Sequence, residues 1–356
     1  MRRIKNMNIH ELFSEAVRLG ASDLHLIVGN PPILRKDGKL FPVEHTSLLS
    51  QSDTKRLAEE VMSESQKEIF ATNKEIDFSY SSEGSRFRVN VYCQRGSVAA
   101  DFRLIPITIR TIDQLGLPGI CHEFTKLRQG FILVTGPTGH GKSTTLAAMI
   151  QKINETQARH IVTIEDPIEY IYPKGLSLIS QREMHEDTHS WNVALRSVLR
   201  EDPDVVLIGE MRDLETISAA ITIAETGHLV FATLHTNSAS QTIDRIVDVF
   251  PENQQLQVRL QLAAVIEGVL SQRLVPSLSG GRTAVMEIMT GTPAIRATVR
   301  DGKTHLIDNI IQTSAELGMV PLETALATAV KEGKISLETA TSYAIRPEEL
   351  GRLLKQ

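Results

Sequence analysis

The first hundred residues switch between a helical and a strand-like pattern of hydrophobic positions. Residues 9–19 place apolar side chains at helical spacing, with Asn8 suited to an N-cap and Gly20 to a stop. Alternation with period two then predicts strands, and short polar segments predict turns between them. The expected strands are residues 23–28, 76–80, 87–93 and 98–104, the expected turns are 36–38, 83–84 and 95–96, and a polar helix is expected near 52–63. We therefore predict a small α+β domain over residues 1–105.

The predicted strand 87–93 has two chemically different faces. Phe87 and Val89 share the apolar face, whereas Arg86 and Arg88 lie on the other. A row of cationic side chains on a sheet is either a solvated outer surface or a surface that binds an anionic ligand. The pattern alone leaves both interpretations open.

The hydrophobic pattern changes after residue 105. Residues 106–118 have no clear period and end in Leu-Gly-Leu-Pro-Gly, which predicts a linker. Four near-continuous apolar runs then alternate with helical segments, as in a parallel sheet that is buried on both faces. These runs are residues 131–135, 161–164, 205–208 and 229–232. We predict an α/β core over 119–290 and a helical region over 291–356, which begins with Thr292 as cap and Pro293 in the first turn.

A glycine-rich segment lies between the first of these runs and a helical pattern. It reads G-P-T-G-H-G-K-S-T and consists of Gly136, Pro137, Thr138, Gly139, His140, Gly141, Lys142, Ser143 and Thr144. The glycines allow backbone N–H groups to turn toward a phosphate, and the helix that follows adds its positive end. Lys142 supplies a cation and the Ser143 hydroxyl a ligand for Mg²⁺. This pattern predicts a phosphate-binding loop (P-loop) rather than a flexible turn.

Acidic residues follow the next two apolar runs. Glu165 directly follows the run 161–164, and Glu210 comes two residues after the run 205–208. Ligands of open α/β sheets bind at the carboxyl ends of the strands, so both acids are placed for chemistry. We interpret Glu210 as the general base for an attacking water. Glu165 is either a group that binds water or metal or a solvated acid of the loop. Asp213 is instead expected to be the N-cap of a helix over 214–226.

Two histidines bracket the last apolar run, His228 at its start and His235 at its end. A histidine at a strand end commonly has a structural hydrogen-bonding role. His235 follows a strand whose carboxyl end should lie beside the P-loop, which favours a role as a γ-phosphate sensor or hydrogen-bond relay. For His228 both interpretations stay open. Metal ligation is not expected, because no second histidine or cysteine has zinc-like spacing nearby.

Composition narrows the class of protein and its location in the cell. The chain has 356 residues, which is more than one domain of about 150 residues, and a formal net charge of −5. The acidic balance argues against a surface that binds nucleic acid. Cys93 and Cys121 are too few for a disulfide framework or a four-cysteine zinc site. With neither an export signal nor a membrane-spanning run, we expect a cytoplasmic protein.

Four segments, in this order, resemble the motifs of the secretion ATPase superfamily, and most closely those of the PilT-type ATPases of type IV pili. They are G-P-T-G-H-G-K-S-T, T-I-E-D-P-I-E-Y, E-D-P-D-V-V-L-I-G-E-M-R-D and T-G-H-L-V-F-A-T-L-H-T-N. The resemblance implies a PAS-like N-terminal domain and a RecA-like ATPase domain with a helical C-terminal tail. It also implies a homo-hexameric ring that hydrolyses ATP with Mg²⁺ to retract pili.

The resemblance also assigns residues. By it, Glu165 corresponds to the acid of the Asp box and Glu210 to the catalytic Walker B glutamate. His228 and His235 correspond to the His-box histidines. N-terminal-domain arginines reach the nucleotide in this family, and Arg88 and Arg103 are the best candidates here, with Arg86 and Arg110 as further ones. The implied partners are an inner-membrane platform protein, which would bring the ring to the membrane peripherally, and a paralogous pilus ATPase.

Within the superfamily, the lack of a four-cysteine zinc element favours retraction over pilus assembly or secretion. Residues 294–299 match the retraction signature A-I-R-N-L-I at the first three positions and diverge after them. An accessory PilU-like paralogue is therefore the nearest alternative. A nucleotide-binding adaptor with little turnover and a nucleic-acid translocase on the same fold are the other two, and the acidic balance disfavours the last.

Overall fold

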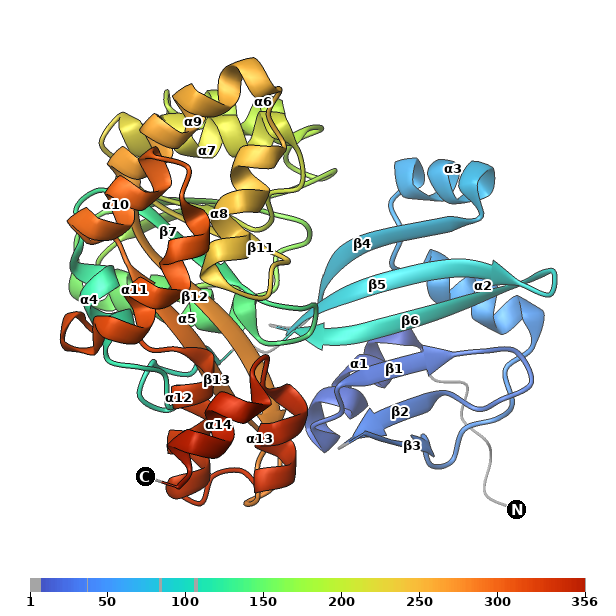
Figure 1. Ribbon diagram of the computed structural model, residues 1–356. Coiled ribbons are helices and arrows are strands. Elements are labelled where there is room, and N and C mark those ends of the chain that lie inside the picture. The colour runs from blue at the N-terminus through green and yellow to red at the C-terminus, as the bar shows by residue number, and fades with distance from the viewer. Residues whose placement is uncertain (1–7, 37, 83–84, 106–107, 356) are drawn as a thin grey trace. The chain divides into compact units, whose positions relative to one another are not determined.

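The chain divides into two compact units in a computed structural model, which describes residues 8–355 except 37, 83–84 and 106–107 (Figure 1). One unit comprises residues 1–108 and 169–171, and the other comprises 109–168 and 172–356. The division falls within the segment 106–118, whose first two residues lie outside the described ones. Ile112 and Leu117 of this segment pack in a core of the second unit.

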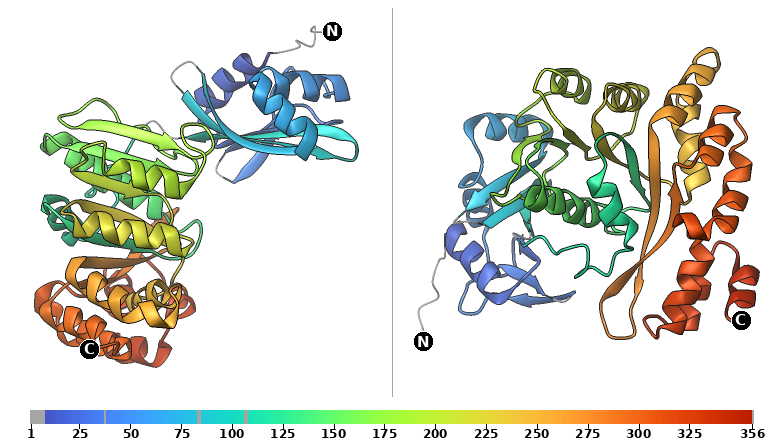
Figure 2. Two further views of the ribbon diagram at one scale, coloured as in Figure 1. Left: turned by 90° about the horizontal axis from the view of Figure 1, so that it is seen from above. Right: turned by 90° about the vertical axis from the view of Figure 1, so that its left-hand side faces the viewer.

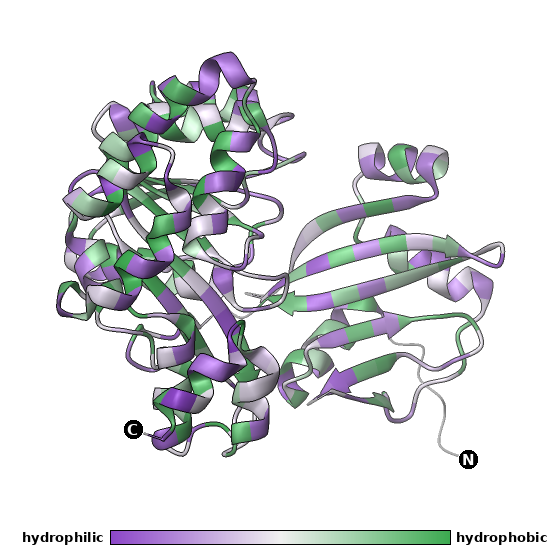
Figure 3. Cartoon of the chain, in the orientation of Figure 1, coloured by the Kyte–Doolittle hydropathy of each residue, from purple (hydrophilic) through white to green (hydrophobic). Residues whose placement is uncertain are grey.

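In its described residues, the N-terminal unit is a six-stranded antiparallel sheet with three helices. The strand order is β3-β2-β1-β6-β5-β4. Hydropathy alternates along its longer strands, as the bands of Figure 3 show, because one face of the sheet covers a core and the other does not. The elements are α1 (Ile9–Leu19), β1 (Asp23–Leu26), β2 (Ile33–Lys36), β3 (Lys39–Pro42), α2 (Gln51–Glu59), α3 (Glu64–Asn73), β4 (Glu75–Ser82), β5 (Ser85–Gln94) and β6 (Ser97–Ile105).

The predicted local signals of this unit can be checked one by one. The helix over 9–19 is confirmed, with Asn8 accepting a hydrogen bond from the Glu11 N–H and Gly20 in the left-handed conformation. Residues 95 and 96 both have positive φ, 48° and 76°, as a tight hairpin requires. The turns at 36–38 and 83–84 contain Asp37, Glu83 and Gly84, which lie outside the described residues.

The helix expected near 52–63 corresponds to α2, which is shorter and ends at Glu59. A second helix, α3, follows it, because Ser63 forms a capping box with Gln66 and starts a new helix at Glu64. We had not predicted α3. None of its residues is buried, and it lacks the apolar stripe by which a helix is predicted from the sequence.

The second unit is built around a seven-stranded sheet of order β13-β12-β7-β11-β10-β8-β9. The strands from β12 to β9 are parallel, as predicted for the apolar runs, and β13 is antiparallel to β12. The strands and the connecting helices are α4 (Ile120–Lys126), β7 (Gly130–Thr135), α5 (Lys142–Thr156), β8 (His160–Glu165), β9 (Leu178–Glu183), α6 (Trp191–Val198), β10 (Val205–Ile208), α7 (Leu214–Glu225), β11 (Leu229–Leu234), α8 (Ala239–Asp248), α9 (Glu252–Val265), β12 (Ile266–Pro276) and β13 (Arg282–Thr290).

Both faces of this sheet are covered by helices, which Figure 2 shows from two further directions. Phe131 and Leu133 of β7 pack with residues of α6 to α9 in one core cluster. Ile132 and Val134 of the same strand pack with α5 in another. Successive side chains of a strand point to opposite faces, so a strand covered on both faces becomes continuously apolar. The prediction that the parallel sheet is buried on both faces is thereby confirmed.

The hairpin β12–β13 departs from the predicted alternation of strands and helices, and we had not predicted it. Its far end packs against the C-terminal helices through Val275 and Val285. The remaining elements are α10 (Pro293–Arg300), η1 (Thr304–Leu306), α11 (Ile307–Thr313), η2 (Ala315–Leu317), α12 (Leu322–Lys331), α13 (Leu337–Tyr343) and α14 (Pro347–Leu353). Among the described residues, no helix is both long enough and apolar enough to span a membrane.

Candidate functional site

The predicted site residues of the second unit gather at the carboxyl ends of four adjacent strands. In sheet order these strands are β7, β11, β10 and β8. The P-loop follows β7, His235 follows β11, Glu210 follows β10 and Glu165 ends β8. Parallel pairing brings these ends to one edge of the sheet, so residues up to a hundred positions apart in the sequence become neighbours.

The P-loop joins β7 to α5 through three glycines with positive φ, Gly136, Gly139 and Gly141. At Gly136 a Cβ atom would lie 2.2 Å from the Gln272 carbonyl oxygen of β12, so no other residue fits there without displacing backbone. Helix α5 starts directly at Lys142 without a side-chain cap. Its first N–H groups are therefore available to an anion, as at other phosphate-binding helix ends.

Lys142 and His235 meet inside the loop. The Lys142 ammonium donates to the carbonyl oxygens of Gly136 at 2.8 Å and Pro137 at 3.1 Å, and its Nζ lies 3.4 Å from His235 Nδ1. The Thr138 hydroxyl lies 3.3 Å from the same ring nitrogen. An ammonium group can only donate, so Nδ1 accepts from it and a neutral ring carries its proton on Nε2. That proton then points to the far side of the ring.

Glu210 lies on that far side. His235 Nε2 is 3.1 Å from Glu210 Oε1, and Arg212 donates to the other carboxylate oxygen at 2.7 Å. Burial works to raise the pKa of Glu210, but the hydrogen bond and charge of Arg212, with the charge of Lys142, hold it below its ordinary value. Glu210 is thus an ionised carboxylate at the sheet edge where the P-loop and His235 lie.

Glu165 is more enclosed than Glu210. It is buried at the end of β8, and its Oε1 accepts from the Thr163 hydroxyl at 2.7 Å and from the Gln181 amide at 3.3 Å. These contacts fix the carboxylate at the same edge as Glu210, since β8 and β10 are adjacent. The arrangement suits an acid that orients a water molecule or an outer ligand of a metal ion.

The donor set fits Mg²⁺ bound together with phosphate. Ser143 lies in the first turn of α5, directly after Lys142, and is partly exposed. Among the described residues, no group of three or more histidine, cysteine or acidic side chains forms a metal cage. Mg²⁺ typically binds through few protein oxygens and completes its shell with substrate phosphates and water, which is what a hydroxyl beside a P-loop offers.

Strand β12 contributes a residue that sequence reasoning missed. Gln272 is 2% exposed, accepts from the Thr145 hydroxyl at 2.6 Å and donates to the His140 carbonyl oxygen at 2.7 Å. It therefore clamps the end of the loop to the first turns of α5. In the sequence Gln272 stands between Ser271 and Arg273, so the hydrophobic pattern does not single it out.

The same hairpin holds the P-loop at two further points. The Leu274 N–H donates to His140 Nδ1 at 3.1 Å, and Arg282 donates to the Gly139 carbonyl oxygen at 3.1 Å. Burial, together with the charges of Arg273, Lys142 and Arg282, lowers the pKa of His140. The His140 ring thus anchors the loop to β12.

His228 and the pair Arg88 and Arg103 are not part of this site in the second unit. His228 directly precedes β11, so it lies at the amino edge of the sheet, and its Nδ1 lies 3.0 Å from the Ile223 carbonyl oxygen, to which it donates. Arg88 and Arg103 belong to the N-terminal unit, where they are directly opposite each other on β5 and β6. Both are exposed, and Arg103 is paired with Asp23 at 2.9 Å.

The N-cap prediction for Asp213 is confirmed. Its Oδ1 accepts from the N–H and from the hydroxyl of Thr216, at 2.8 and 2.6 Å, and α7 starts at the next residue. These two hydrogen bonds lower the pKa of Asp213. The carboxylate is therefore committed to the helix end.

Comparison with known proteins agrees with this geometry. The PilT retraction ATPase of type IV pili from Pseudomonas aeruginosa is 47% identical over 326 residues, 90% of this chain and 93% of PilT. PilU, a type IV pilus ATPase of the same organism, is 40% identical over 90% of this chain and 84% of its own. A crystal structure of the pilus retraction motor PilT with bound ADP superposes with a TM-score of 0.91, covering 98% of this chain and all of the other, at 47% identity.

The N-terminal and RecA-like fold expected from the sequence motifs is thereby confirmed. The sequence pattern described as "Type II/IV secretion system protein" matches residues 3–333. The P-loop, the two acids and His235 lie at one sheet edge, and the matches cover most of the chain. The chain therefore belongs to the type II/IV secretion system protein family.

Proposed function

We propose that this chain is an ATP-hydrolysing motor that retracts type IV pili. The observation that carries the proposal is the contact series from Lys142 through His235 to Glu210, which connects a phosphate-binding loop to an ionised carboxylate. The similarity to the PilT retraction ATPase supports retraction as the work that hydrolysis drives.

Each group of the site has a task in hydrolysis. The N–H groups of the P-loop and of the first turn of α5 bind the β- and γ-phosphates, and Lys142 adds positive charge. Glu210 accepts a proton from the water whose oxygen attacks the γ-phosphorus, while the bond to the bridging oxygen of ADP breaks. Mg²⁺ held by Ser143 and the phosphates would offset the charge that develops, with Glu165 orienting its water shell.

His235 couples the two ends of this series. With its Nδ1 toward Lys142 and Thr138 and its Nε2 toward Glu210, the ring touches both the phosphate-binding group and the base. A γ-phosphate that draws Lys142 away changes the hydrogen bonding of Nδ1, and Nε2 transmits the change to Glu210. His235 therefore acts as a γ-phosphate sensor.

The working form that we propose is a homo-hexameric ring, as the family resemblance implies. Arg88 and Arg103 share one face of the N-terminal sheet and expose their guanidinium groups, so a neighbouring copy's nucleotide is a suitable partner for them. Cations that reach the γ-phosphate from a second subunit stabilise the charge of the transition state. An inner-membrane platform protein would receive the force on the cytoplasmic side, and a paralogous pilus ATPase is a further candidate partner.

ATP turnover across a dilution series tests this proposal, with Glu210→Gln as the key variant. The expected result is that activity per chain falls as the protein is diluted and that Glu210→Gln lowers it on the order of 10²-fold or more. The matched control is Glu215→Gln, an exposed acid in the first turn of α7, which should keep full activity.

Two outcomes would contradict the proposal. Unchanged hydrolysis in Glu210→Gln would exclude Glu210 as the base. Tight nucleotide binding without turnover at any protein concentration would instead support a nucleotide-binding adaptor or an accessory PilU-like paralogue.

A further inference from the structure

Strand β13 carries an ionisable side chain inside the core. Glu287 is 4% exposed and lies on the same face of the strand as Val285 and Met289, both of which pack in hydrophobic clusters. Burying a carboxylate in apolar surroundings is costly unless specific partners compensate. The hydrolytic groups described above do not include Glu287, so its partners decide what it does.

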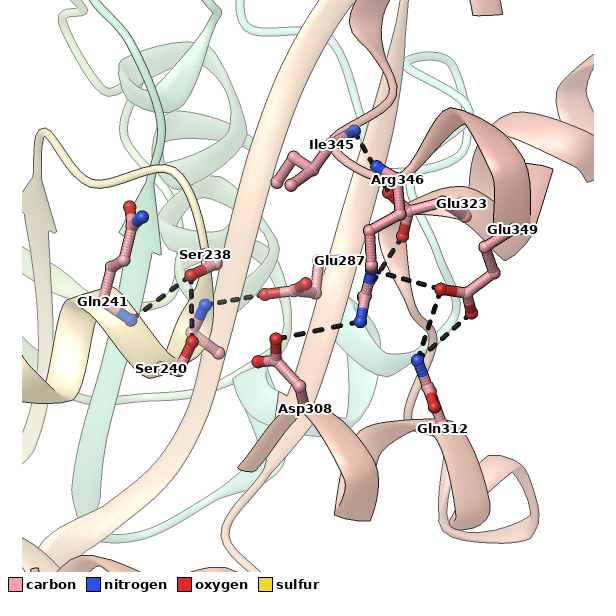
Figure 4. Close-up of polar contacts among 11 residues, drawn as sticks. Ser238, Ser240, Gln241, Glu287, Asp308, Gln312, Glu323, Ile345, Arg346 and Glu349 are labelled. Atoms are coloured by element: carbon pink, nitrogen blue, oxygen red, sulfur yellow. Dashed lines mark hydrogen bonds and ion pairs between the residues drawn. The ribbon is translucent and has the colours of Figure 1, made fainter. Parts of the chain in front are cut away.

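The partner of Glu287 is the start of helix α8. Its Oε1 accepts a 2.6 Å hydrogen bond from the N–H of Ala239, the first residue of the helix (Figure 4). Ser238, the N-cap, accepts from the Gln241 N–H at 3.2 Å. Since helix N-termini favour negative charge, the carboxylate stabilises this helix end electrostatically as well as by the hydrogen bond.

The helix end that Glu287 holds lies four residues after His235. The segment 235–239 connects β11 to α8, and two side-chain contacts fix its middle. The Thr236 hydroxyl lies 2.7 Å from that of Thr242, and Arg273 of β12 donates to the Asn237 carbonyl oxygen at 3.5 Å. Glu287 thus fixes the far end of the short segment that carries the proposed sensor.

The same carboxylate adjoins the charges of the C-terminal helices. Arg346 lies 3.3 Å from Glu323, 3.9 Å from Asp308 and 3.1 Å from Glu349. Glu323 has no exposed surface, and its Oε1 also accepts from the N–H groups of residues 345 and 346 at 3.1 and 2.8 Å. One guanidinium group therefore serves three carboxylates drawn together from α11, α12 and α14 (Figure 4).

Groups on the neighbouring elements shift the pKa of Glu287. Burial raises the pKa of Glu287 to about 7, with the Ala239 N–H opposing, the charges of Asp308 and Glu323 adding to the rise and Arg346 opposing. The strand neighbour on β12 is Ser271, which carries no charge. Any shift of the C-terminal charges therefore changes the strength of the bond between Glu287 and α8.

We propose that Glu287 is a positioning residue for ATP hydrolysis, which holds the segment 235–239 so that His235 stays between Lys142 and Glu210. Through it, the C-terminal helices adjust the hydrolytic step without touching the nucleotide. This inference rests on the sensor role proposed for His235.

Hydrogen exchange and steady-state kinetics of the full-length variants Glu287→Leu and Glu287→Gln test this inference. Glu287→Leu removes the acceptor, so we expect faster exchange in a peptide covering 235–241 and no change in one covering 136–144. It should lower kcat about tenfold, as the loss of one hydrogen bond implies, and leave ADP affinity within twofold. Met289→Leu, which conserves volume on the same face, is the control and should change neither property.

Glu287→Gln keeps an oxygen acceptor but no charge, so it tests the inference even if Glu287→Leu fails to fold. Exchange over 235–241 should be roughly threefold faster than in the wild type at pH 8, and equal to it at pH 6, where Glu287 itself is protonated. Equal exchange at both pH values would overturn the inference.

A separate variant distinguishes this inference from the function on which it rests. Full turnover in His235→Asn, together with faster exchange over 235–241 in the Glu287 variants, would refute the sensor role while leaving the link between Glu287 and α8 intact. Unchanged exchange in Glu287→Leu would refute that link whatever His235 does.

Discussion

The two ends of strand β11 carry the same type of side chain in different surroundings. His228 at the amino end donates to the Ile223 carbonyl oxygen of the preceding helix and lies beside the Thr226 hydroxyl, which is a local, structural arrangement. His235 at the carboxyl end contacts groups that follow two other strands, Lys142 and Glu210. The carboxyl edge of a parallel sheet collects the loops of several strands, so the position along the strand separates the two histidines where residue type cannot.

Replacing the two histidines in turn tests whether their position along the strand separates their roles. His235→Asn should lower ATP turnover on the order of 10²-fold, because the ring that joins Lys142 to Glu210 is lost. His228→Asn should keep turnover within twofold, since an asparagine amide can also donate to a carbonyl oxygen at a strand start. Steady-state ATPase assays on both variants decide the matter, and equal losses would contradict the comparison.

A second prediction concerns the P-loop's support at the same edge. Gln272→Met conserves the volume but leaves the Thr145 hydroxyl and the His140 carbonyl oxygen without their partner. We expect the Kd for ADP to rise about tenfold, measured by titration with a fluorescent analogue. Gln257→Met on the exposed side of α9 is the control. An unchanged Kd in Gln272→Met would mean that the loop keeps its shape without this clamp.

The third prediction is one of stability and concerns Glu287. Its pKa of about 7 in the fold lies above the ordinary 4.5, so the folded state binds a proton that the unfolded state has released. The associated stability is complete below pH 4.5 and is lost as pH rises through 7. Relative to Glu287→Gln, the wild type should lose up to about 3 kcal/mol in free energy of unfolding between pH 4.5 and 8.

Urea denaturation of both proteins at several pH values measures this difference. A difference that does not vary with pH would show that Glu287 titrates normally in the fold. The sign of this difference also bears on function. Near neutral pH the ionised Glu287 lowers the stability of the fold, and residues retained at a cost to stability typically serve activity.

Much of the site could be predicted because its signals are local. The P-loop pattern, the acids after two apolar runs and the cap at Asp213 each depend on residues within a few positions of one another. Parallel pairing of the apolar runs then places Glu210 and His235 beside Lys142 without further information.

The remainder depends on contacts between distant segments, which no local pattern reports. Gln272 meets the P-loop from 132 residues away in the sequence, and Glu287 meets Ala239 from 48 residues away. The hairpin that carries both of them adds an antiparallel strand to a parallel sheet, and the alternation of strands and helices did not predict it. Glu287, a charged residue between apolar neighbours, is a sequence signal of this kind, whereas Gln272 lies between Ser271 and Arg273 and is not.

The most direct measurement is the identity of the nucleotide that Glu210→Gln retains after incubation with ATP and Mg²⁺. If Glu210 accepts the proton of the attacking water, the variant binds ATP through an intact P-loop and releases it unhydrolysed, while Glu215→Gln under the same conditions contains ADP. Recovery of ADP from Glu210→Gln at the rate of the control would contradict the central claim that the carboxyl edge of this sheet hydrolyses ATP through Glu210.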